Sequence, residues 1–322
     1  MRVGVDTAPL VQTQAGTARH IRGLVSAVRT REGIDLELLS FGGTGRLSSI
    51  ARDALWYPFA LALRSRKLDV LHCTTFRGPL RARAPVVVTV HDLAILRYPE
   101  TLPPWHRLSG RWGLRSALEA ADALVAVSDF TRRELVELVG IPGERIRVIP
   151  NGVDPVFGPD GPTAPGDYVL AVATLEPRKN LTRAVEAARI AGVELRVVGA
   201  RGWGGVEVPG WVGEVPDGEL AALYRGARCL LYPSLYEGFG LPVLEAMACG
   251  TPVVTSRGTA MEEVSAGAAV LVDPLDPEAI AAGIDEASSR RAELAARGLA
   301  RAGELTWERA ASAVVDLWRE LA

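Results

Sequence analysis

Residues 229–255 read CLLYPSLYEGFGLPVLEAMACGTPVVT, and this stretch predicts the folding pattern of the chain. The apolar run Cys229–Tyr232 has the length and composition of a buried strand, and a loop with two glycines follows it. Pro242 suits the first turn of a helix, because that position needs no backbone N–H. Gly250 ends the helix, and Pro252–Thr255 begins another strand. Strand, loop, helix and strand in this order predict a crossover in a parallel sheet.

The same alternation extends over the rest of the chain. Short β-branched runs alternate with longer helical patterns, which is typical of parallel sheets with crossover helices. The predicted strands are Arg2–Asp6, Asp35–Ser40, Asp69–Cys73, Pro85–Val90, Ala123–Val127, Arg145–Ile149, Tyr168–Ala173, Glu194–Val198, Cys229–Tyr232, Pro252–Thr255 and Ala268–Val272. A helical stretch around Trp307–Leu321 ends the chain. We therefore predict an α/β protein with doubly wound, Rossmann-like domains.

Residues 150–166 are dense in proline and glycine and predict a linker. At 322 residues the chain is long for one hydrophobic core, so two domains are expected. We predict an N-terminal domain at 1–157, a C-terminal domain at 158–305 and a helix at 306–322 that packs back toward the N-terminal domain. Two such domains predict a cleft that faces the carboxyl ends of both sheets, where ligands of these sheets bind.

Composition excludes several functional classes. The 36 basic and 38 acidic side chains nearly cancel, so a nucleic-acid partner is not expected. The three cysteines, Cys73, Cys229 and Cys249, are too few and too far apart for a disulfide framework, and we expect small buried thiols in a reducing cytoplasm. The N-terminus reads as a strand rather than a signal peptide, and no apolar run is long enough to span a bilayer. A cytoplasmic protein is expected, and contact with a membrane surface stays open.

The glycine loop before Pro242 predicts an anion site. Glycines let backbone N–H groups approach an anion closely, and the helix N-terminus adds a partial positive charge, which together suit a diphosphate. Glu237 lies in the loop and Glu245 about one turn into the helix, so their carboxylates sit at different depths around one ligand. Glu245 can accept from both hydroxyls of a ribose and Glu237 from sugar hydroxyls. For an isolated pair, an exposed glutamate and an ordinary helical one would be the simpler interpretation.

A second charged segment, ATLEPRKN at residues 173–180, again runs from a strand through a turn into a helix. Arg178 and Lys179 bring two cationic donors to a strand end, where they could neutralise a diphosphate leaving group as its charge develops. The alternative is a solvated charge pair at a helix start.

The loop, the Glu-x7-Glu spacing, the helix and the closing Gly-Thr-Pro-Val-Val resemble the motif of the retaining glycosyltransferases of family 4. The resemblance implies the GT-B architecture, two Rossmann-like domains that face a cleft, with an acceptor-side N-terminal domain and a donor-binding C-terminal domain. It implies that Glu245 binds the donor ribose and Glu237 the transferred sugar. The residues implied to contact the donor along the loop and beyond it are Gly238, Phe239, Gly240, Leu241 and Val212.

Further family positions lie in the first half and around the charged segment. The resemblance implies that His91, after a predicted strand, contacts the donor sugar, although a lone histidine there is usually structural. Residues 14–19 keep one glycine of a loop that is usually richer in glycine, and amides of Gly16 or Thr17 are expected at the phosphate. Lys179 matches the family's lysine. Thr174 stands where many members have an arginine, so that role either passes to Arg178 or is weaker here.

One more segment concerns the acceptor. Residues 104–119 carry arginines at every fourth position, which predicts a basic helical stripe. Its members are Arg107, Arg111 and Arg115, with Trp105, Leu108 and Trp112 nearby. Such a helix could meet an anionic lipid-linked acceptor or a membrane, or it could be a surface helix whose aromatic rings pack inward.

The resemblance implies a retaining, metal-independent transfer of a hexose from a nucleotide-diphosphate sugar to a glycan or lipid-linked acceptor. No cofactor is expected, because no Asp-x-Asp is present to hold a divalent metal at the diphosphate. The sequence as a whole looks most similar to bacterial mannosyltransferases of surface polysaccharide assembly, so GDP-mannose is expected as the donor ahead of UDP-hexoses. The alternatives are a GT-B nucleotide-sugar epimerase, a polymerising enzyme that resembles glycogen synthase, and a non-catalytic protein that binds nucleotide sugars or glycans.

Overall fold

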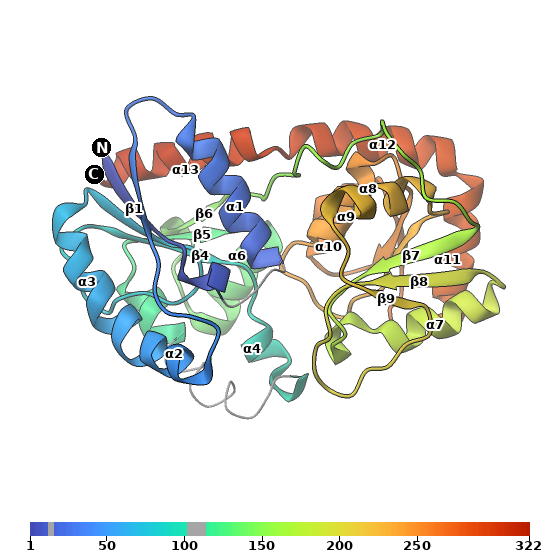
Figure 1. Ribbon diagram of the computed structural model, residues 1–322, viewed down its shortest axis with the longest axis horizontal. Coiled ribbons are helices and arrows are strands. Elements are labelled where there is room, and N and C mark those ends of the chain that lie inside the picture. The colour runs from blue at the N-terminus through green and yellow to red at the C-terminus, as the bar shows by residue number, and fades with distance from the viewer. Residues whose placement is uncertain (12–15, 102–113) are drawn as a thin grey trace. The chain divides into compact units, whose positions relative to one another are not determined.

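The computed structural model describes residues 1–11, 16–101 and 114–322 (Figure 1). The chain forms two compact units. Unit 1 holds Met1–Arg97, the described residues of 114–152 and Trp307–Ala322. Unit 2 holds Val153–Thr306 and a short piece that starts at Tyr98. Each unit has one six-stranded parallel sheet with helices packed against it, which is the doubly wound architecture expected from the sequence.

The sheet of unit 1 has the strand order β2-β1-β3-β4-β5-β6. Its strands are β1 (Arg2–Asp6), β2 (Asp35–Leu39), β3 (Val70–Cys73), β4 (Val86–Val90), β5 (Ala123–Ala126) and β6 (Ile146–Val148). Its helices are α1 (Gly16–Arg29), α2 (Arg46–Ala51), α3 (Leu61–Arg64), α4 (Ala94–Arg97), α6 (Asp129–Glu134) and α13 (Trp307–Leu321), with shorter or wider turns at η1 (Ala8–Val11), η2 (Arg52–Ala60), η3 (Ser65–Lys67), η5 (Leu135–Val139) and η6 (Gly143–Arg145). From β1 the chain first adds β2 on one side and then returns to add β3 to β6 on the other side. The pair β1 and β3 is therefore the topological switch point of the sheet.

The sheet of unit 2 has the strand order β12-β11-β10-β7-β8-β9. Its strands are β7 (Tyr168–Val172), β8 (Glu194–Val198), β9 (Trp211–Gly213), β10 (Leu230–Tyr232), β11 (Val253–Ser256) and β12 (Val270–Val272). Its helices are α7 (Leu181–Ile190), α8 (Asp217–Gly226), α9 (Leu241–Ala248), α10 (Ala260–Ser265), α11 (Pro277–Ser289) and α12 (Arg291–Glu304), with the short turns η4 (Pro99–Thr101) and η7 (Pro177–Lys179). Its switch point lies between β7 and β10.

All eleven predicted strands are present, each with both ends within two residues of the expected ones. Strand β9 was missed. It has three residues, a partly exposed position at the edge of the sheet and a glycine-rich approach, so it lacks the buried apolar run by which the other strands are detected. The last helix, α13, has the predicted bounds.

The proline- and glycine-rich segment before β7 packs on unit 2. The Arg225 side chain donates from Nε to the carbonyl of Pro162 (2.7 Å) and from Nη1 to that of Gly158 (3.0 Å). The Phe157 ring meets the edge of the Tyr224 ring with centroids 5.9 Å apart. These contacts with α8 hold the segment on unit 2.

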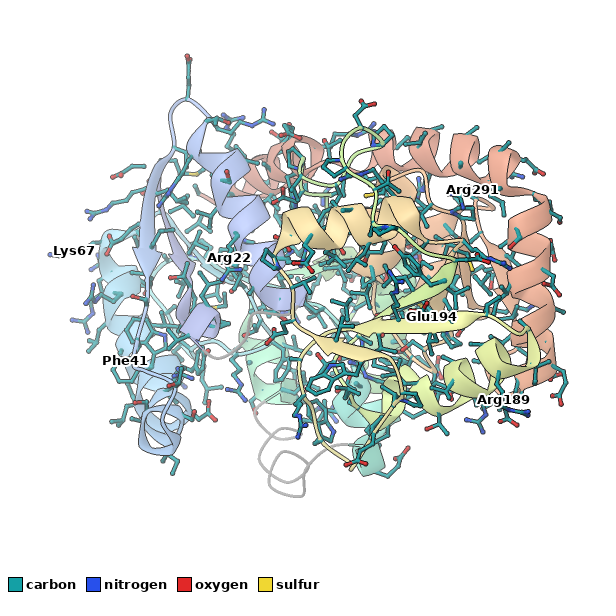
Figure 2. The ribbon with its side chains drawn as sticks, turned by 45° about the vertical axis from the view of Figure 1, so that its right-hand side comes forward. Arg22, Phe41, Lys67, Arg189, Glu194 and Arg291 are labelled. Atoms are coloured by element: carbon teal, nitrogen blue, oxygen red, sulfur yellow. The ribbon has the colours of Figure 1, made fainter. Side chains whose placement is uncertain are left out.

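Both units have an apolar core. In unit 2 the core includes Cys229, and in both units the cysteines are free and buried, as expected. At the edge of this unit Arg291, labelled in Figure 2, donates to the carbonyls of Ala227 and Arg228. No helix among the described residues is long and apolar enough to cross a bilayer.

The core of unit 1 joins the two ends of the sequence. The apolar face of α1 packs on α13, where the Trp318 side chain is fully buried. Gly23 permits this contact, because a Cβ there would lie 2.1 Å from Cε2 of Trp307. Helix α13 is therefore part of the core of unit 1, although it follows unit 2 in the sequence.

We predict that Gly23→Ala destabilises unit 1 by ~1–3 kcal/mol, because the added methyl group forces α1 and α13 apart. The matched control is Gly303→Ala in α12, where a Cβ would meet nothing within 4 Å. That change should instead stabilise its helix by ~0.5–1 kcal/mol, since alanine favours helix. Urea unfolding of both variants measures the two effects, and a Gly23→Ala protein as stable as the parent would refute the packing argument.

Candidate active site

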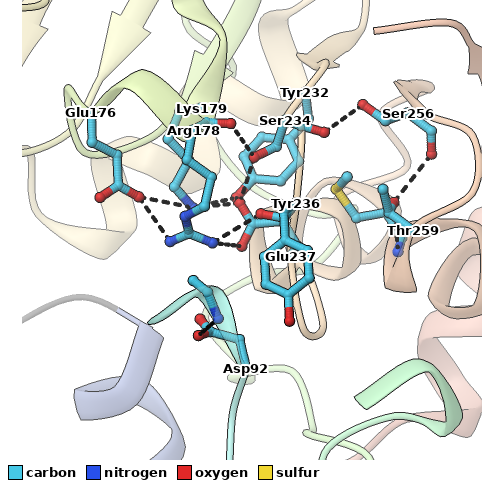
Figure 3. Close-up of polar contacts among 12 residues, drawn as sticks. Asp92, Glu176, Arg178, Lys179, Tyr232, Ser234, Tyr236, Glu237, Ser256 and Thr259 are labelled. Atoms are coloured by element: carbon cyan, nitrogen blue, oxygen red, sulfur yellow. Dashed lines mark hydrogen bonds and ion pairs between the residues drawn. The ribbon is translucent and has the colours of Figure 1, made fainter. Parts of the chain in front are cut away.

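The charged residues of unit 2 gather at its switch point. Glu176, Arg178 and Lys179 follow β7, and Ser234 and Glu237 follow β10. Because β7 and β10 are neighbours in a parallel sheet, the two loops leave from the same edge. Figure 3 shows the side chains converging there.

The Glu237 carboxylate is the centre of the cluster (Figure 3). Its Oε1 accepts from Lys179 Nζ (2.5 Å), from the Ser234 hydroxyl (2.7 Å) and from the Tyr232 hydroxyl (3.0 Å). Its Oε2 accepts from Nη1 of Arg178 (3.3 Å). The Glu237 side chain is only 10% exposed, so these donors replace the water that a carboxylate would otherwise bind.

Charge balance explains why the buried carboxylate stays ionised. Burial by itself raises the pKa of Glu237, but Lys179 and then Arg178 outweigh it and lower the pKa to about 2. Burial and the neighbouring Glu237 raise the pKa of Tyr232 well above its usual range, so that phenol remains a neutral donor. The Glu237 carboxylate therefore stays ionised at every ordinary pH.

Glu176 is the second carboxylate of the cluster. Its Oε1 accepts from Nη2 of Arg178 at 2.8 Å and lies 3.9 Å from Nζ of Lys179. The Arg178 guanidinium also donates to the carbonyl of Tyr236 (2.9 Å). Two cations and two carboxylates thus form one buried network, which holds both cations in fixed positions.

The backbone around Asn180 ties three loops together. Asn180 has φ of 58° in the left-handed region and lies between η7 and α7. Its side-chain amide donates to the carbonyls of Pro233 (2.9 Å) and Pro274 (2.6 Å), which follow β10 and β12. An asparagine tolerates this conformation better than most residues and supplies the donor as well. The turn that presents Arg178 and Lys179 is therefore anchored to the loop that carries Glu237.

Helix α9 begins as predicted from its glycine and proline. Gly240 has φ of 96°, and a Cβ there would lie 2.8 Å from Cγ of Met261, so this position requires glycine. Pro242 occupies the first turn. Within the helix, the buried Glu245 accepts from the hydroxyl of Tyr224 at 2.9 Å, and that bond aims its carboxylate.

The structure brings together three of the predicted residues, Glu237, Arg178 and Lys179. Gly238, Phe239, Gly240 and Leu241 lead directly from Glu237 into α9, and Phe239 and Leu241 are buried. Val212 is in the edge strand β9 and is 54% exposed. Gly16, Thr17 and His91 belong to unit 1, where Gly16 begins α1 and His91 follows β4.

His91 is held by its own unit. Its Nε2 donates to the carbonyl of Thr74 (2.9 Å), and its ring meets the edge of the His20 ring with centroids 4.6 Å apart. Burial lowers the pKa of His91, so the ring is neutral at pH 7. Of the predicted basic stripe, Arg115 pairs with Glu119 at 2.8 Å. Its other members, Arg107, Arg111, Trp105, Leu108 and Trp112, lie outside the described residues, as do Gln14 and Ala15.

The sequence interpretation missed Glu176, Tyr232 and Ser234 as members of the cluster. All three are polar residues at or after the ends of two buried strands, which is where ligands of parallel sheets bind. Their position at or after the end of a predicted strand was therefore the feature by which the sequence could have indicated them. Within the described residues, no group of three or more His, Cys, Asp or Glu side chains is placed to hold a metal ion.

Solved structures share this architecture along the whole chain. Sucrose-phosphate synthase from Thermosynechococcus elongatus superposes with a TM-score of 0.77 at 19% identity, over 100% of this chain and 99% of that one. HepE of Anabaena, solved with UDP-glucose, superposes with a TM-score of 0.76 at 18% identity over all of both chains. The two doubly wound sheets therefore define a GT-B glycosyltransferase fold.

Sequence comparison identifies the family. The Glycosyltransferase Family 4 model matches residues 15–157, and the Glycosyl transferases group 1 model matches residues 161–302. The chain is 32% identical to O-antigen chain mannosyltransferase B of Escherichia coli, over 98% of this chain and 88% of that protein. The chain belongs to the family 4, group 1 glycosyltransferases and is a glycosyltransferase.

We predict that Glu237→Gln lowers the free energy of unfolding at pH 7 by ~3–5 kcal/mol, because it leaves two buried cations without their common partner. The native pKa of about 2 lies below the ordinary 4.5, so the unfolded chain binds the proton more tightly. This stabilisation is complete above pH 4.5 and is lost as the pH falls toward 2. Denaturant unfolding at several pH values should therefore show the difference between parent and variant shrinking in that window.

Glu293→Gln is the matched control. The pKa of Glu293 is also lowered to about 2, through hydrogen bonds from Arg290 and Arg297, but Glu293 lies on the surface of α12. Solvent screens an exposed pair, so this variant should unfold like the parent at every pH. An equal loss of stability in both variants would contradict the role of burial at Glu237.

Proposed function

We propose that this enzyme transfers mannose from GDP-mannose to a glycan or lipid-linked acceptor, with retention and without a divalent metal. The observation that carries the proposal is the buried network in which Glu237 holds Lys179 and Arg178 at the switch point of unit 2. This network fixes a pair of cations at the place where an open α/β sheet binds its ligand. A diphosphate leaving group is the chemistry that such a pair would serve.

Mannose is favoured by a relative that is named a mannosyltransferase. Mannosyltransferase B of Escherichia coli aligns with nearly the entire chain at 32% identity. HepE, the structural neighbour solved with UDP-glucose, is 18% identical and therefore informs the fold rather than the donor. GDP-mannose is accordingly proposed ahead of UDP-hexoses.

Two features support the proposal of metal independence. The sequence has no Asp-x-Asp, the arrangement that would hold a divalent ion between carboxylates and a diphosphate. In its place the ammonium of Lys179 and the guanidinium of Arg178 supply positive charge that is already positioned. The backbone N–H groups that open α9 add the helix dipole.

In the proposed reaction the bond between the anomeric carbon and the diphosphate oxygen breaks as the acceptor oxygen bonds to the same carbon. The acceptor approaches on the face that the nucleotide leaves, through an oxocarbenium-like transition state. The departing phosphate oxygen takes the proton of the acceptor hydroxyl. Glu245, aimed by Tyr224, is assigned to the ribose hydroxyls of the donor. His91 and the amides of Gly16 and Thr17 are assigned to the sugar and phosphate.

Glu237 has a more specific part in this proposal than sugar contact alone. Its Oε1 accepts three hydrogen bonds and its Oε2 accepts one, so only Oε2 has capacity for a sugar hydroxyl. The carboxylate therefore both positions the two cations and presents one oxygen to the substrate.

We predict that GDP-mannose raises the melting temperature more than GDP-glucose, UDP-glucose or UDP-galactose, and by the same amount with EDTA present. A ligand at 100 times its Kd stabilises the native state by ~2.7 kcal/mol. A thermal-shift panel with and without chelator measures this. A larger shift with a UDP-sugar would replace the proposed donor, and loss of the shift in EDTA would overturn metal independence.

We predict that Lys179→Ala lowers turnover about 100-fold or more, because one of the two fixed cations at the leaving group is gone. Lys179→Arg should recover only part of the rate, since a guanidinium cannot occupy the space of an ammonium. The chain has one other lysine, the exposed Lys67, so Lys67→Ala is the matched control. Turnover is measured as mannoside formed on octyl α-mannoside, with nucleotide release followed with and without that acceptor.

The two lysines also permit a direct test of location. GDP-mannose should protect Lys179 from acetylation, and Lys67 should react equally with and without it. Normal turnover by Lys179→Ala, or acetylation of Lys179 that the donor does not slow, would discard the proposed role.

A further inference from the structure

Glu176 is a buried carboxylate to which the proposed reaction gives no part. Its side chain is only 4% exposed, less than those of Arg178 (14%) and Lys179 (12%). Glu176 occupies the N-cap position of η7, but its side chain makes no capping hydrogen bond within the described residues. Aspartate, asparagine or serine would suit that position better if the turn needed a cap. The carboxylate therefore contacts the two cations rather than the turn that carries it.

The two carboxylates and the two cations of the cluster compensate one another in charge. Glu237 lies 2.5 Å from Nζ of Lys179 and 3.3 Å from Nη1 of Arg178. Glu176 lies 2.8 Å from Nη2 of Arg178 and 3.9 Å from Nζ of Lys179. Figure 3 shows the Arg178 guanidinium between the two carboxylates. With Glu237 alone these side chains would carry one excess positive charge, and with Glu176 as well they carry none.

Burial makes this balance matter for a charged ligand. Exposed charges are screened by water and salt, whereas charges a few ångströms apart in a largely buried site interact strongly. A diphosphate that contacted both cations would lie next to the carboxylate that both of them face. Glu176 therefore repels the ligand that Arg178 and Lys179 attract.

An excess of positive charge would not improve a transferase. The leaving group is still a diphosphate after the sugar has gone, so the cations bind the product as well as the donor. Binding energy that donor, transition state and product share lowers KM without raising the rate of the chemical step. It also slows product release, which limits turnover in many enzymes. A second carboxylate behind the cations reduces this shared binding energy.

We propose that Glu176 acts through Arg178 and Lys179 to limit the affinity of the site for diphosphate, so that the nucleoside diphosphate leaves after each transfer. The proposal rests on the proposed function, which assigns a diphosphate leaving group to these two cations. In the alternative role Glu176 only orients the Arg178 guanidinium, and its loss would then weaken diphosphate binding. The two roles predict changes in affinity of opposite sign.

Calorimetric titration with inorganic pyrophosphate, in EDTA and at low salt, measures that sign. Glu176→Gln keeps an oxygen that can accept from Arg178 but loses the negative charge, so the Kd for pyrophosphate should fall about tenfold or more. Glu176→Asp keeps the charge and should bind pyrophosphate as the parent does. Unchanged or weaker binding by Glu176→Gln overturns the proposal. Equally tight binding by Glu176→Asp also overturns it, because the gain would then not come from charge.

Glu194→Gln is the matched control. Glu194, labelled in Figure 2, begins β8 and therefore lies at the amino edge of the sheet, whereas the cluster lies at the carboxyl edge. Its side chain is 55% exposed and pairs with Arg196. Solvent screens this charge, so the variant should keep the Kd of the parent for pyrophosphate.

Two variants without Arg178 separate charge from orientation, and they do not depend on the stability of Glu176→Gln. Arg178→Gln should weaken pyrophosphate binding. Glu176→Gln added to it should recover part of the loss, because a carboxylate without its cation still repels the ligand. Removing both members of a buried ion pair is tolerated better than removing one. If Glu176 only orients Arg178, the second change leaves the Kd of Arg178→Gln unaltered, and the proposal is overturned.

Kinetics with GDP-mannose and octyl α-mannoside give an independent readout. In Glu176→Gln the donor KM and the inhibition constant of GDP should both fall, and kcat should fall relative to the rate of a single turnover with enzyme in excess, because GDP leaves more slowly. Mannosyl transfer by the parent, combined with no tighter binding of pyrophosphate or GDP in the variant, sinks this proposal and leaves the proposed function intact. Tighter pyrophosphate binding by the variant supports it even if GDP-mannose is not turned over.

Discussion

The ion pair between Glu237 and the two cations Lys179 and Arg178 is the interaction on which the site depends. Two positive side chains that are both largely buried repel one another and lose their hydration. Neither would therefore stay in place without a buried counterion. Glu237 supplies that counterion across the gap between two loops. The same contacts therefore set the positions of the cations and join the loops that follow β7 and β10.

Topology explains why both units have polar clusters at equivalent places. In each sheet the crossovers diverge at one pair of neighbouring strands, β1 and β3 in unit 1 and β7 and β10 in unit 2. Loops that diverge leave backbone and side chains available to a ligand. The clusters differ in charge and in pairing. The one in unit 2 is ionic, and its charged groups pair with one another, whereas the one in unit 1 is Asp6 with Arg52 and Tyr57, and each of these side chains has a buried polar atom without a hydrogen-bond partner among the described residues.

The sequence predicted those features that depend on residues close to one another along the chain. Buried apolar runs predicted the strands, and Gly240 with Pro242 predicted the start of α9. It also predicted Glu237 and Lys179 as site residues, through the resemblance of their loops. It could not predict the partners of Glu237, because β10 lies beside β7 only after β8 and β9 have passed to the other side. The contact between Trp56 and Asp6 could not be predicted for the same reason, because it joins β1 to a helical turn 50 residues away in the sequence.

The choice of lysine at position 179 follows from the crowding around Glu237. This chain has 36 basic side chains, and Lys179 is one of just two lysines among them. Nζ of Lys179 lies 2.5 Å from Oε1 of Glu237 and 3.2 Å from the Tyr232 hydroxyl, whereas Arg178 donates to Oε2 of the same carboxylate. A guanidinium is planar, and its donors diverge in a fork, so a second one would compete with Arg178 for the same carboxylate. An ammonium is compact and directs its three donors to separate points, which allows it to bond Glu237 and Tyr232 and still offer an N–H to a phosphate oxygen.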